Sequence, residues 1–249
     1  MQLNYARKAN GLYVLSRNDI EDIATLILEE YYPQNLIYPI PLNTIGLLEE
    51  HLGLTVKNKY IGTFESGILG LIVMNDEAEI PSYDDMYKPT ILQETYGTVI
   101  ISKQLSGKEN MSRRRYTEVH EGSHFILHSD YYKNTLNNVA NRSNNLFDYI
   151  ACRRVELYKT STNNNSSWAE WQADTLAAAL LMPKAVFYSF VKSVFRENGI
   201  TGNYIVNTPY VNKKQVHDII SQIAERFNVS YRAAQIRMIH LGLIVENSF

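Results

Sequence analysis

Apolar residues near the start of the chain recur at the spacing of two amphipathic helices. Over residues 20–28 they fall on one helical face, and Ser16 precedes them at the spacing of a helix-capping residue. This pattern predicts a helix over about 18–31. A second, shorter helix is expected to begin after a cap at Asn43 and to stop at Gly53, since glycine commonly ends helices.

Runs of aliphatic and β-branched residues replace the helical pattern farther along the chain. They cover Leu54–Val56, Ile68–Met74 and Thr98–Ser102, and residues such as Gly, Pro, Asp and Asn separate them. Such runs predict the strands of a small sheet, to whose edge an extended peptide can add a further strand. A helix is expected next, over about 110–128.

The second half of the chain is expected to be largely helical. Stretches 134–145 and 160–167 are rich in Asn and Ser and predict loops. A helix is expected over 168–181 and another over about 183–194, where proline is a favourable first residue. Two glycines and a proline in 197–212 indicate a linker.

Composition and charge narrow the class of protein. The chain has 249 residues, 45% of them apolar, which is enough for the core of one large domain or of one domain with a small appendage. Its formal net charge of −2 provides no bulk attraction to nucleic acid or to anionic membranes. The longest apolar runs are too short for a bilayer, no signal-peptide pattern is visible, and the single cysteine suits a reducing compartment. We therefore expect a soluble, cytoplasmic protein.

The helix predicted over 110–128 contains an HExxH motif formed by His120, Glu121 and His124. Residues four positions apart lie one turn above each other, so both histidines can reach one metal ion while the glutamate flanks it. Catalytic zinc commonly has three protein ligands and one position left for water. The motif therefore predicts a hydrolytic zinc site with Glu121 as its catalytic base and with a third ligand from elsewhere.

Two acidic residues on the helix predicted over 168–181 are candidates for the third ligand. Glu170 and Asp174 lie one turn apart in an alanine-rich segment and share a face that another helix can approach closely. Buried acids need a partner, and a metal ion with its histidines is one. We expect Glu170 to bind the zinc and Asp174 to accept a hydrogen bond from a ligand histidine, with Asp174 kept as an alternative ligand.

His128 is not expected to be a third histidine ligand. It lies eight positions after His120, or about 12 Å along a continuous helix, so these residues and His124 cannot all bind one ion. A structural role or a hydrogen bond to the substrate is expected instead. Three arginines at 113–115 stay outside the predicted site, because a solvated run of charges is an equally good interpretation.

The sequence RRRYTEVHEGSHFILH at 113–128, followed by EWQAD at 170–174 and AAALLMP at 177–183, resembles the ImmA/IrrE family of metallopeptidases. Members of that family typically have an Arg-Phe-Thr segment before the HExxH helix. Their second helix typically has the form Glu-x-Glu-Ala-Asn and ends in Leu-Leu-Met-Pro. The resemblance implies that zinc is bound by the two histidines of the motif and by Glu170.

The chain departs from this family pattern at three positions near the predicted site. Tyr116 stands where phenylalanine is usual, Gln172 where a second glutamate is usual, and Asp174 where asparagine is common. Because glutamine replaces the second glutamate, one fewer carboxylate on this helix competes with Glu170 as a candidate metal ligand. The aspartate makes the helix resemble that of thermolysin-type enzymes.

Residues 213–249 are expected to form a helix-turn-helix-like pair. Helical spacing over 217–227 is followed by Asn228, which tolerates a left-handed turn, and by Ser230 as the cap of a second helix. With five basic and three acidic residues, this segment has too little positive charge to bind the phosphate groups of DNA well. In addition, Arg237 lies where an apolar packing residue is expected. Direct DNA binding is therefore not expected.

Together these features predict an α+β fold: a zincin-like metallopeptidase, mostly helical, with a small N-terminal sheet beside the HExxH helix and the C-terminal pair. The predicted domains are a peptidase domain at 1–196, a linker at 197–212 and the helical element at 213–249. The resemblance implies a zinc-dependent endopeptidase acting on a protein substrate, typically a helix-turn-helix repressor whose cleavage derepresses mobile-element or stress-response genes. The alternative is a metal-binding or DNA-binding regulator without proteolysis. No membrane partner is expected, and the oligomeric state is left open.

Overall fold

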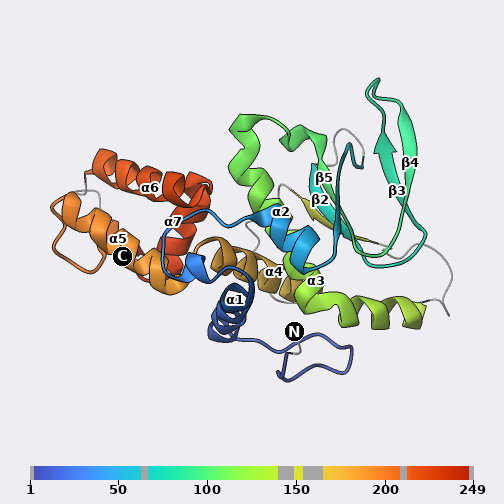
Figure 1. Cartoon of the computed structure of the whole chain (residues 1–249), viewed down its shortest axis with the longest axis horizontal. Coiled ribbons are helices and arrows are strands. Elements are labelled where there is room, and N and C mark those ends of the chain that lie inside the picture. The colour runs from blue at the N-terminus through green and yellow to red at the C-terminus, as the bar shows by residue number, and fades with distance from the viewer. Residues whose placement is uncertain (1–2, 63–66, 140–148, 154–164, 208–211, 247–249) are drawn as a thin grey trace. The chain divides into compact units, whose positions relative to one another are not determined.

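The computed structural model describes residues 3–62, 67–139, 149–153, 165–207 and 212–246 of the chain (Figure 1). The α-helices in these ranges are α1 (Arg17–Tyr31), α2 (Thr44–Gly46), α3 (Met111–Val139), α4 (Asn165–Leu181), α5 (Lys184–Glu197), α6 (Lys213–Phe227) and α7 (Tyr231–His240). The strands are β1 (Thr55–Lys59), β2 (Ile68–Val73), β3 (Ala78–Tyr83), β4 (Pro89–Glu94), β5 (Thr98–Ser102), β6 (Tyr149–Arg153), β7 (Ile205–Asn207) and β8 (Ile244–Glu246). A π-helical turn, η2 (Leu47–His51), continues α2, and short 3-10 turns are η1 (Pro33–Leu36), η3 (Lys103–Leu105) and η4 (Lys108–Asn110).

Contacts divide the chain into two compact units. Unit 1 comprises Met1–Ile20 and Asn43–Ala177, and unit 2 comprises Glu21–Leu42 and Ala178–Phe249, so the division passes through α1 and α4. Within unit 2, β7 lies in the stretch predicted as a linker and pairs in parallel with β8. The predicted domain boundaries stay a prediction, because a compact unit is defined by contacts and not by independent folding.

The sheet of unit 1 has four strands in the order β1-β5-β2-β6. β1 is parallel to β5, and β2 is antiparallel to both β5 and β6. β2 is buried at every position, which explains its uninterrupted apolar run. Ile72 belongs to an apolar cluster that Phe125 of α3 joins, whereas Leu71 packs in a second cluster with Ile80 of β3. Thus α3 packs on the sheet on one side, and the base of the β3–β4 hairpin contributes to a separate cluster (Figure 1).

The predicted helices and the three predicted strands are confirmed, with differences in extent. α3 continues to Val139, because Asn and Thr lower helix propensity by less than about 0.7 kcal/mol each and an established helix can include them. The β3–β4 hairpin was not predicted, since Pro81 and Pro89 interrupt its pattern. The two predicted loops are wrong at 134–139 and 165–167, which belong to α3 and α4. Their other residues, 140–145 and 160–164, lie outside the described ranges.

The C-terminal helices of unit 2 form the expected helix-turn-helix-like pair. Asn228 has a φ of 50° between α6 and α7, and Ser230 caps α7 by accepting a backbone N–H. Arg237 of α7 is 1% exposed, and its guanidinium donates to both carboxylate oxygens of Glu21 and to the carbonyl of Met182. This arginine is therefore a core residue with a buried partner. The pair and the small sheet beside α3 confirm the expected α+β class.

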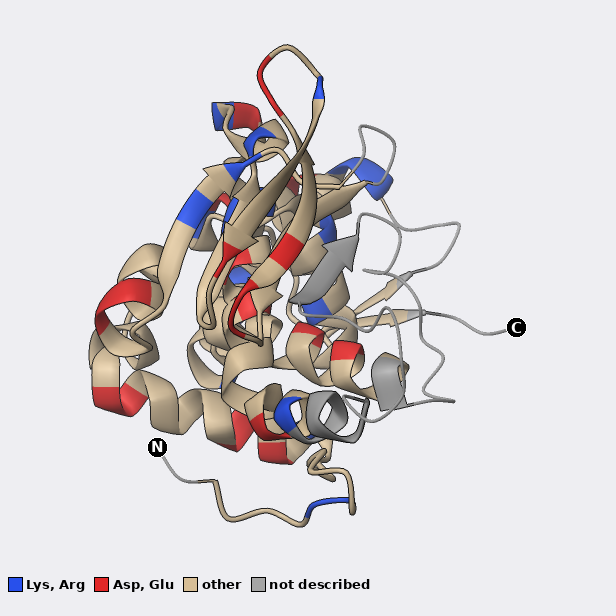
Figure 2. Cartoon of the chain, turned by 90° about the vertical axis from the view of Figure 1, so that its right-hand side faces the viewer, with Lys and Arg blue, Asp and Glu red and all other residues tan. Residues whose placement is uncertain are grey.

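Charged residues of both signs are spread over the ribbon. In Figure 2, Lys and Arg are interspersed with Asp and Glu on the side shown, in keeping with the formal net charge of −2. Among the described residues, no helix by itself has both the length and the apolar character to cross a membrane; one bent pair, Ser167–Leu181 with Lys184–Glu197, meets those two criteria when joined.

Candidate metal centre

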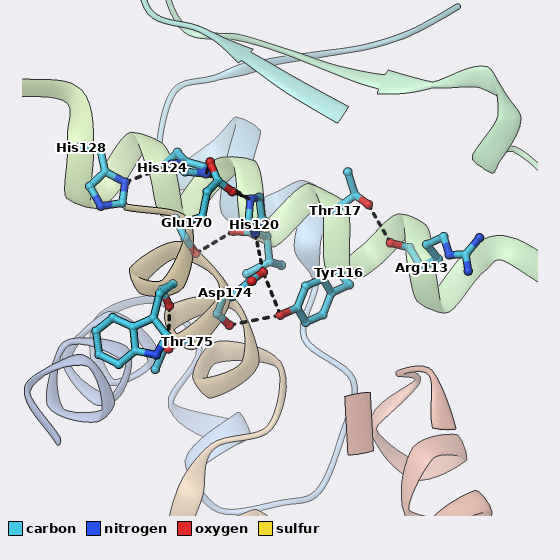
Figure 3. Close-up of polar contacts among 12 residues, drawn as sticks. Arg113, Tyr116, Thr117, His120, His124, His128, Glu170, Asp174 and Thr175 are labelled. Atoms are coloured by element: carbon cyan, nitrogen blue, oxygen red, sulfur yellow. Dashed lines mark hydrogen bonds and ion pairs between the residues drawn. The ribbon is translucent and has the colours of Figure 1, made fainter. Parts of the chain in front are cut away.

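The HExxH motif lies in the middle of α3, where its histidines point towards α4 (Figure 3). His120 and His124 are 1% and 0% exposed, and their Nε2 atoms lie 3.1 Å apart. The rings meet edge to face, with 4.7 Å between their centroids. Because the two histidines are one helical turn apart, their Nε2 atoms lie close together, as the spacing predicted.

Glu170 of α4 lies against both histidines. Its Oε2 is 3.3 Å from Nε2 of His120, and its Oε1 is 3.3 Å from Nε2 of His124. The ligand atoms of these three residues all lie within 4.8 Å of one another. Burial raises the pKa of the Glu170 carboxyl, but the charges and hydrogen bonds of His124 and His120 outweigh it and hold that pKa well below its ordinary value. An ionised carboxylate and two imidazole nitrogens therefore converge, which is a donor set that suits zinc.

Asp174 contacts the opposite nitrogen of His120. Its Oδ1 lies 2.9 Å from Nδ1 of His120, where it can accept a proton in the tautomer that leaves Nε2 available to a metal ion. The hydroxyl of Tyr116 lies 3.2 Å from the backbone carbonyl of Asp174 and 3.3 Å from its Oδ1 (Figure 3). This geometry suits the supporting role predicted for Asp174 and leaves it outside the group of three converging ligand atoms.

Glu121 is fully buried beside the histidines, and strand β2 approaches it closely. A Cβ atom on Gly70 would lie 3.1 Å from Oε1 of Glu121 and 2.4 Å from Cγ2 of Thr117. Glycine at this position therefore leaves room for both side chains. Gly70 is not among the residues predicted from the sequence, although a lone glycine inside an apolar run is a signal of close backbone approach.

His128 lies one turn beyond His124 and is also fully buried. Its Nδ1 is 3.0 Å from Nδ1 of His124, and its Nε2 is 2.9 Å from Oε1 of Gln172 on α4. The amide nitrogen of Gln172 donates to the backbone carbonyl of Tyr13 at 2.9 Å. Burial, followed by the charge of His124, lowers the pKa of His128 to about 3, so its imidazole is neutral. His128 is thus a buried partner of His124, and the part played by Gln172 was not predicted.

Two of the three arginines at 113–115 are held in the fold, whereas Arg113 is exposed, as expected of a solvated run. Nε of Arg114 donates to Glu118 at 2.8 Å, one turn along α3, and Thr44 donates to the same carboxylate at 2.6 Å. Arg115 is only 9% exposed, and burial lowers its pKa. These contacts tie α3 to the segment before the sheet and leave the arginines outside the candidate centre.

Tyr132 of α3 is a second hydroxyl-bearing residue near the histidines. Its ring lies edge-on to that of His128, with 6.5 Å between the centroids. Burial, with the charge of Glu170 next in size, raises the pKa of Tyr132 well above its ordinary value. Its hydroxyl therefore stays protonated at neutral pH.

Comparison with known protein families points to the same region of the chain. The family model Peptidase_M78, described as an IrrE N-terminal-like domain, matches residues 104–238. That range is more than half of the 249 residues and contains both α3 and α4. No curated protein matches the chain significantly.

Proposed function

Because the chain belongs to the IrrE N-terminal-like peptidase family, we propose that it is a zinc-dependent endopeptidase. The observation that supports this most strongly is the convergence of His120, His124 and Glu170, whose ligand atoms lie within 4.8 Å of one another. They come from two facing helices, and the carboxylate of Glu121 is buried beside them. Two histidines with one glutamate are a known ligand set of catalytic zinc in peptidases.

In the proposed centre, zinc would be held by Nε2 of His120, Nε2 of His124 and the carboxylate of Glu170. A zinc ion in this position would supply a Lewis acid that polarises the substrate carbonyl and makes a water molecule more acidic. Asp174 would keep the proton of His120 on Nδ1, so that the Nε2 lone pair stays available and the ring keeps its orientation.

Glu121 is the residue we assign to proton transfer. Its carboxylate would accept a proton from the attacking water and then deliver it to the amine that leaves. The side chain is 0% exposed, and Gly70 allows the backbone of β2 to lie directly against it. This packing would hold the carboxylate in one position during both proton transfers.

For the substrate we propose a protein, specifically a helix-turn-helix repressor whose cleavage would derepress mobile-element or stress-response genes. This part of the proposal rests on the resemblance to ImmA/IrrE peptidases. Direct DNA binding by α6 and α7 is not part of it, because Arg237 is buried on Glu21 and 213–249 has only five basic residues against three acidic ones. A cytoplasmic location and the absence of a membrane partner stay predictions.

Metal analysis and digestion of a repressor encoded beside the gene test the proposal together. The wild-type protein should bind zinc and cleave the repressor. Glu121→Gln should retain zinc and lose cleavage, because an amide cannot take the proton. His124→Ala should lose both zinc and cleavage. Asp130→Asn, which changes an exposed acid on the same helix, is the matched control and should retain both.

The outcomes distinguish the two classes of function. Undiminished cleavage by Glu121→Gln would remove this residue from the chemistry. A wild-type protein that binds zinc but cleaves neither the repressor nor any other protein tested would favour a metal-binding regulator. A wild-type protein without affinity for zinc would refute the proposed centre.

A further inference from the structure

A buried series of hydrogen bonds leads from the N-terminal segment to His124. It joins the carbonyl of Tyr13, the amide of Gln172 and the rings of His128 and His124, and the successive distances are 2.9, 2.9 and 3.0 Å. All three side chains are 0% exposed. We call these four groups the relay; Figure 3 shows its last step, from His128 to His124.

The carbonyl of Tyr13 determines the direction of the relay. A carbonyl oxygen only accepts hydrogen bonds, so Gln172 turns its NH2 group towards Tyr13 and its Oε1 towards His128. Oε1 requires a proton on Nε2 of His128, and the two Nδ1 atoms, 3.0 Å apart, have room for one proton between them. Where each ring has one proton, Nδ1 of His128 is therefore the acceptor, and the proton between the rings belongs to Nδ1 of His124.

The reversed relay brings two acceptors together. With the amide of Gln172 turned over, its Oε1 would face the oxygen of Tyr13, and neither atom has a proton to share. Trp168 also donates to that carbonyl, at 3.2 Å. His128 would then carry its proton on Nδ1, and His124 would carry its own on Nε2, the atom nearest to Glu170. A neutral histidine protonated on Nε2 has no lone pair there for a metal.

We propose that Gln172 and His128 are positioning residues that hold His124 in its Nδ1–H tautomer and so present its Nε2 lone pair to the metal. This inference rests on the proposed metal centre. It gives the two ligand histidines different supports, since His120 is held by the carboxylate of Asp174 and His124 by the neutral relay. Because the relay is buried, water does not compete for its hydrogen bonds.

Nitrogen-15 NMR of protein labelled in its histidine rings tests the tautomers directly. Spectra are recorded for the metal-free protein at alkaline pH and for the zinc-bound protein. We expect the ring proton of His124 on Nδ1, that of His128 on Nε2, and a coupling across the hydrogen bond between the two Nδ1 atoms. A proton on Nδ1 of His128 in either state would overturn the proposal.

Zinc affinities of variants test whether the relay matters for metal binding. His128→Phe and Gln172→Met each remove one link while keeping a side chain of similar size. Each should weaken zinc binding by roughly 10- to 100-fold, the usual effect of losing a residue that supports a metal ligand. Because the links act in series, the double variant should bind zinc about as well as the weaker of the two single variants.

Thr175→Val is the matched control for these variants. Thr175 is a buried residue on the same helix as Gln172, and its hydroxyl donates to the carbonyl of Trp171 within α4. Its removal changes a buried hydrogen bond without changing the relay. The zinc affinity of Thr175→Val should therefore equal that of the wild type, measured by competition with a chromophoric chelator.

The outcomes separate failure of the relay from failure of the proposed function. If the wild type binds no zinc, the metal centre is refuted, whereas the tautomers of the metal-free protein still test the relay. If the wild type binds zinc and both single variants, folded by circular dichroism, bind it equally well, the relay is refuted and the centre stands. The wild-type spectra decide the question even where a variant does not fold.

Discussion

Gly70 is the position where one added methyl group tests the packing around the proposed site. Its φ lies outside the left-handed region, so Gly70→Ala introduces no backbone strain. Without a steric clash the substitution would stabilise the protein by about 0.4–1 kcal/mol, because alanine restricts the unfolded chain more than glycine does. The sign of the change in stability therefore reports whether the clash exists.

The structure predicts a loss of stability. The new Cβ would lie 2.4 Å from Cγ2 of Thr117, well inside the separation of about 3.5–4.0 Å at which carbon atoms make contact. Movement is restricted on both sides, since β2 is buried throughout and Thr117 is 2% exposed with its hydroxyl bound to the carbonyl of Arg113. Overpacking costs about 1–3 kcal/mol. The restriction of the unfolded chain by alanine offsets part of this cost. The free energy of unfolding should therefore fall by about 1–2 kcal/mol, which should lower Tm by roughly 2–8 °C.

Thermal unfolding of a double-mutant cycle measures this effect. Thr117→Ser removes Cγ2 but keeps the hydroxyl, so the double variant with Gly70→Ala should recover most of the lost stability. Cleavage should recover only in part, because the new methyl group still lies 3.1 Å from Oε1 of Glu121. Gly202→Ala is the control, since its Cβ would meet nothing nearer than 3.5 Å. An unchanged or higher Tm for Gly70→Ala, or no rescue by Thr117→Ser, would refute this reasoning.

Three further predictions concern polar side chains that have a partner in the fold. Arg237→Met should destabilise the protein by about 3–5 kcal/mol in chemical denaturation by leaving Glu21 buried without its cation, and adding Glu21→Leu should restore most of the loss; no restoration would contradict this. The metal-free protein should lose stability as the pH falls from about 6.5 towards 3, because the unfolded chain takes up a proton on His128 that the folded protein excludes, and His128→Phe should flatten this slope in denaturation curves. Asp174→Ala should weaken zinc binding by roughly 10- to 100-fold, whereas Tyr116→Phe, which removes one hydroxyl, should have a much smaller effect; equal losses would assign the support of His120 to both residues.

The parts of the candidate site that depend on helical geometry were predictable from the sequence. His120 and His124 lie four positions apart on one helix, so their meeting needs no tertiary information. Glu170 and Asp174 required one further step, the inference that an alanine-rich helix bearing two acids on one face packs against another helix. The structure places these two acids on different nitrogens of His120, a division of contacts that spacing alone had left open.

The parts that depend on long-range packing were not predictable in the same way. Gln172 meets His128 and the carbonyl of Tyr13, and the latter lies 159 positions away in the sequence. A backbone carbonyl belongs to every residue, so no motif marks the one that orients a buried amide. Arg237 looked out of place in α7 because its partner, Glu21, is 216 positions earlier. In both cases the sequence shows the polar residue but does not indicate which distant residue it contacts.

The three departures of this chain from the ImmA/IrrE pattern acquire a common explanation once their contacts are known. The pattern Glu-x-Glu-Ala-Asn has an acid at the position of Gln172 and an amide at that of Asp174, and this chain has the reverse, so one negative charge has moved by two positions. A carboxylate at 172 could not donate to the carbonyl of Tyr13, whereas the glutamine donates to it and accepts from His128. The carboxylate at 174 instead accepts from His120, and Tyr116 brings the hydroxyl that a phenylalanine lacks to the same aspartate. The three departures are therefore linked. With the negative charge at Asp174, Gln172 is the neutral partner of His128, and His120 and Tyr116 are the donors around the carboxylate of Asp174.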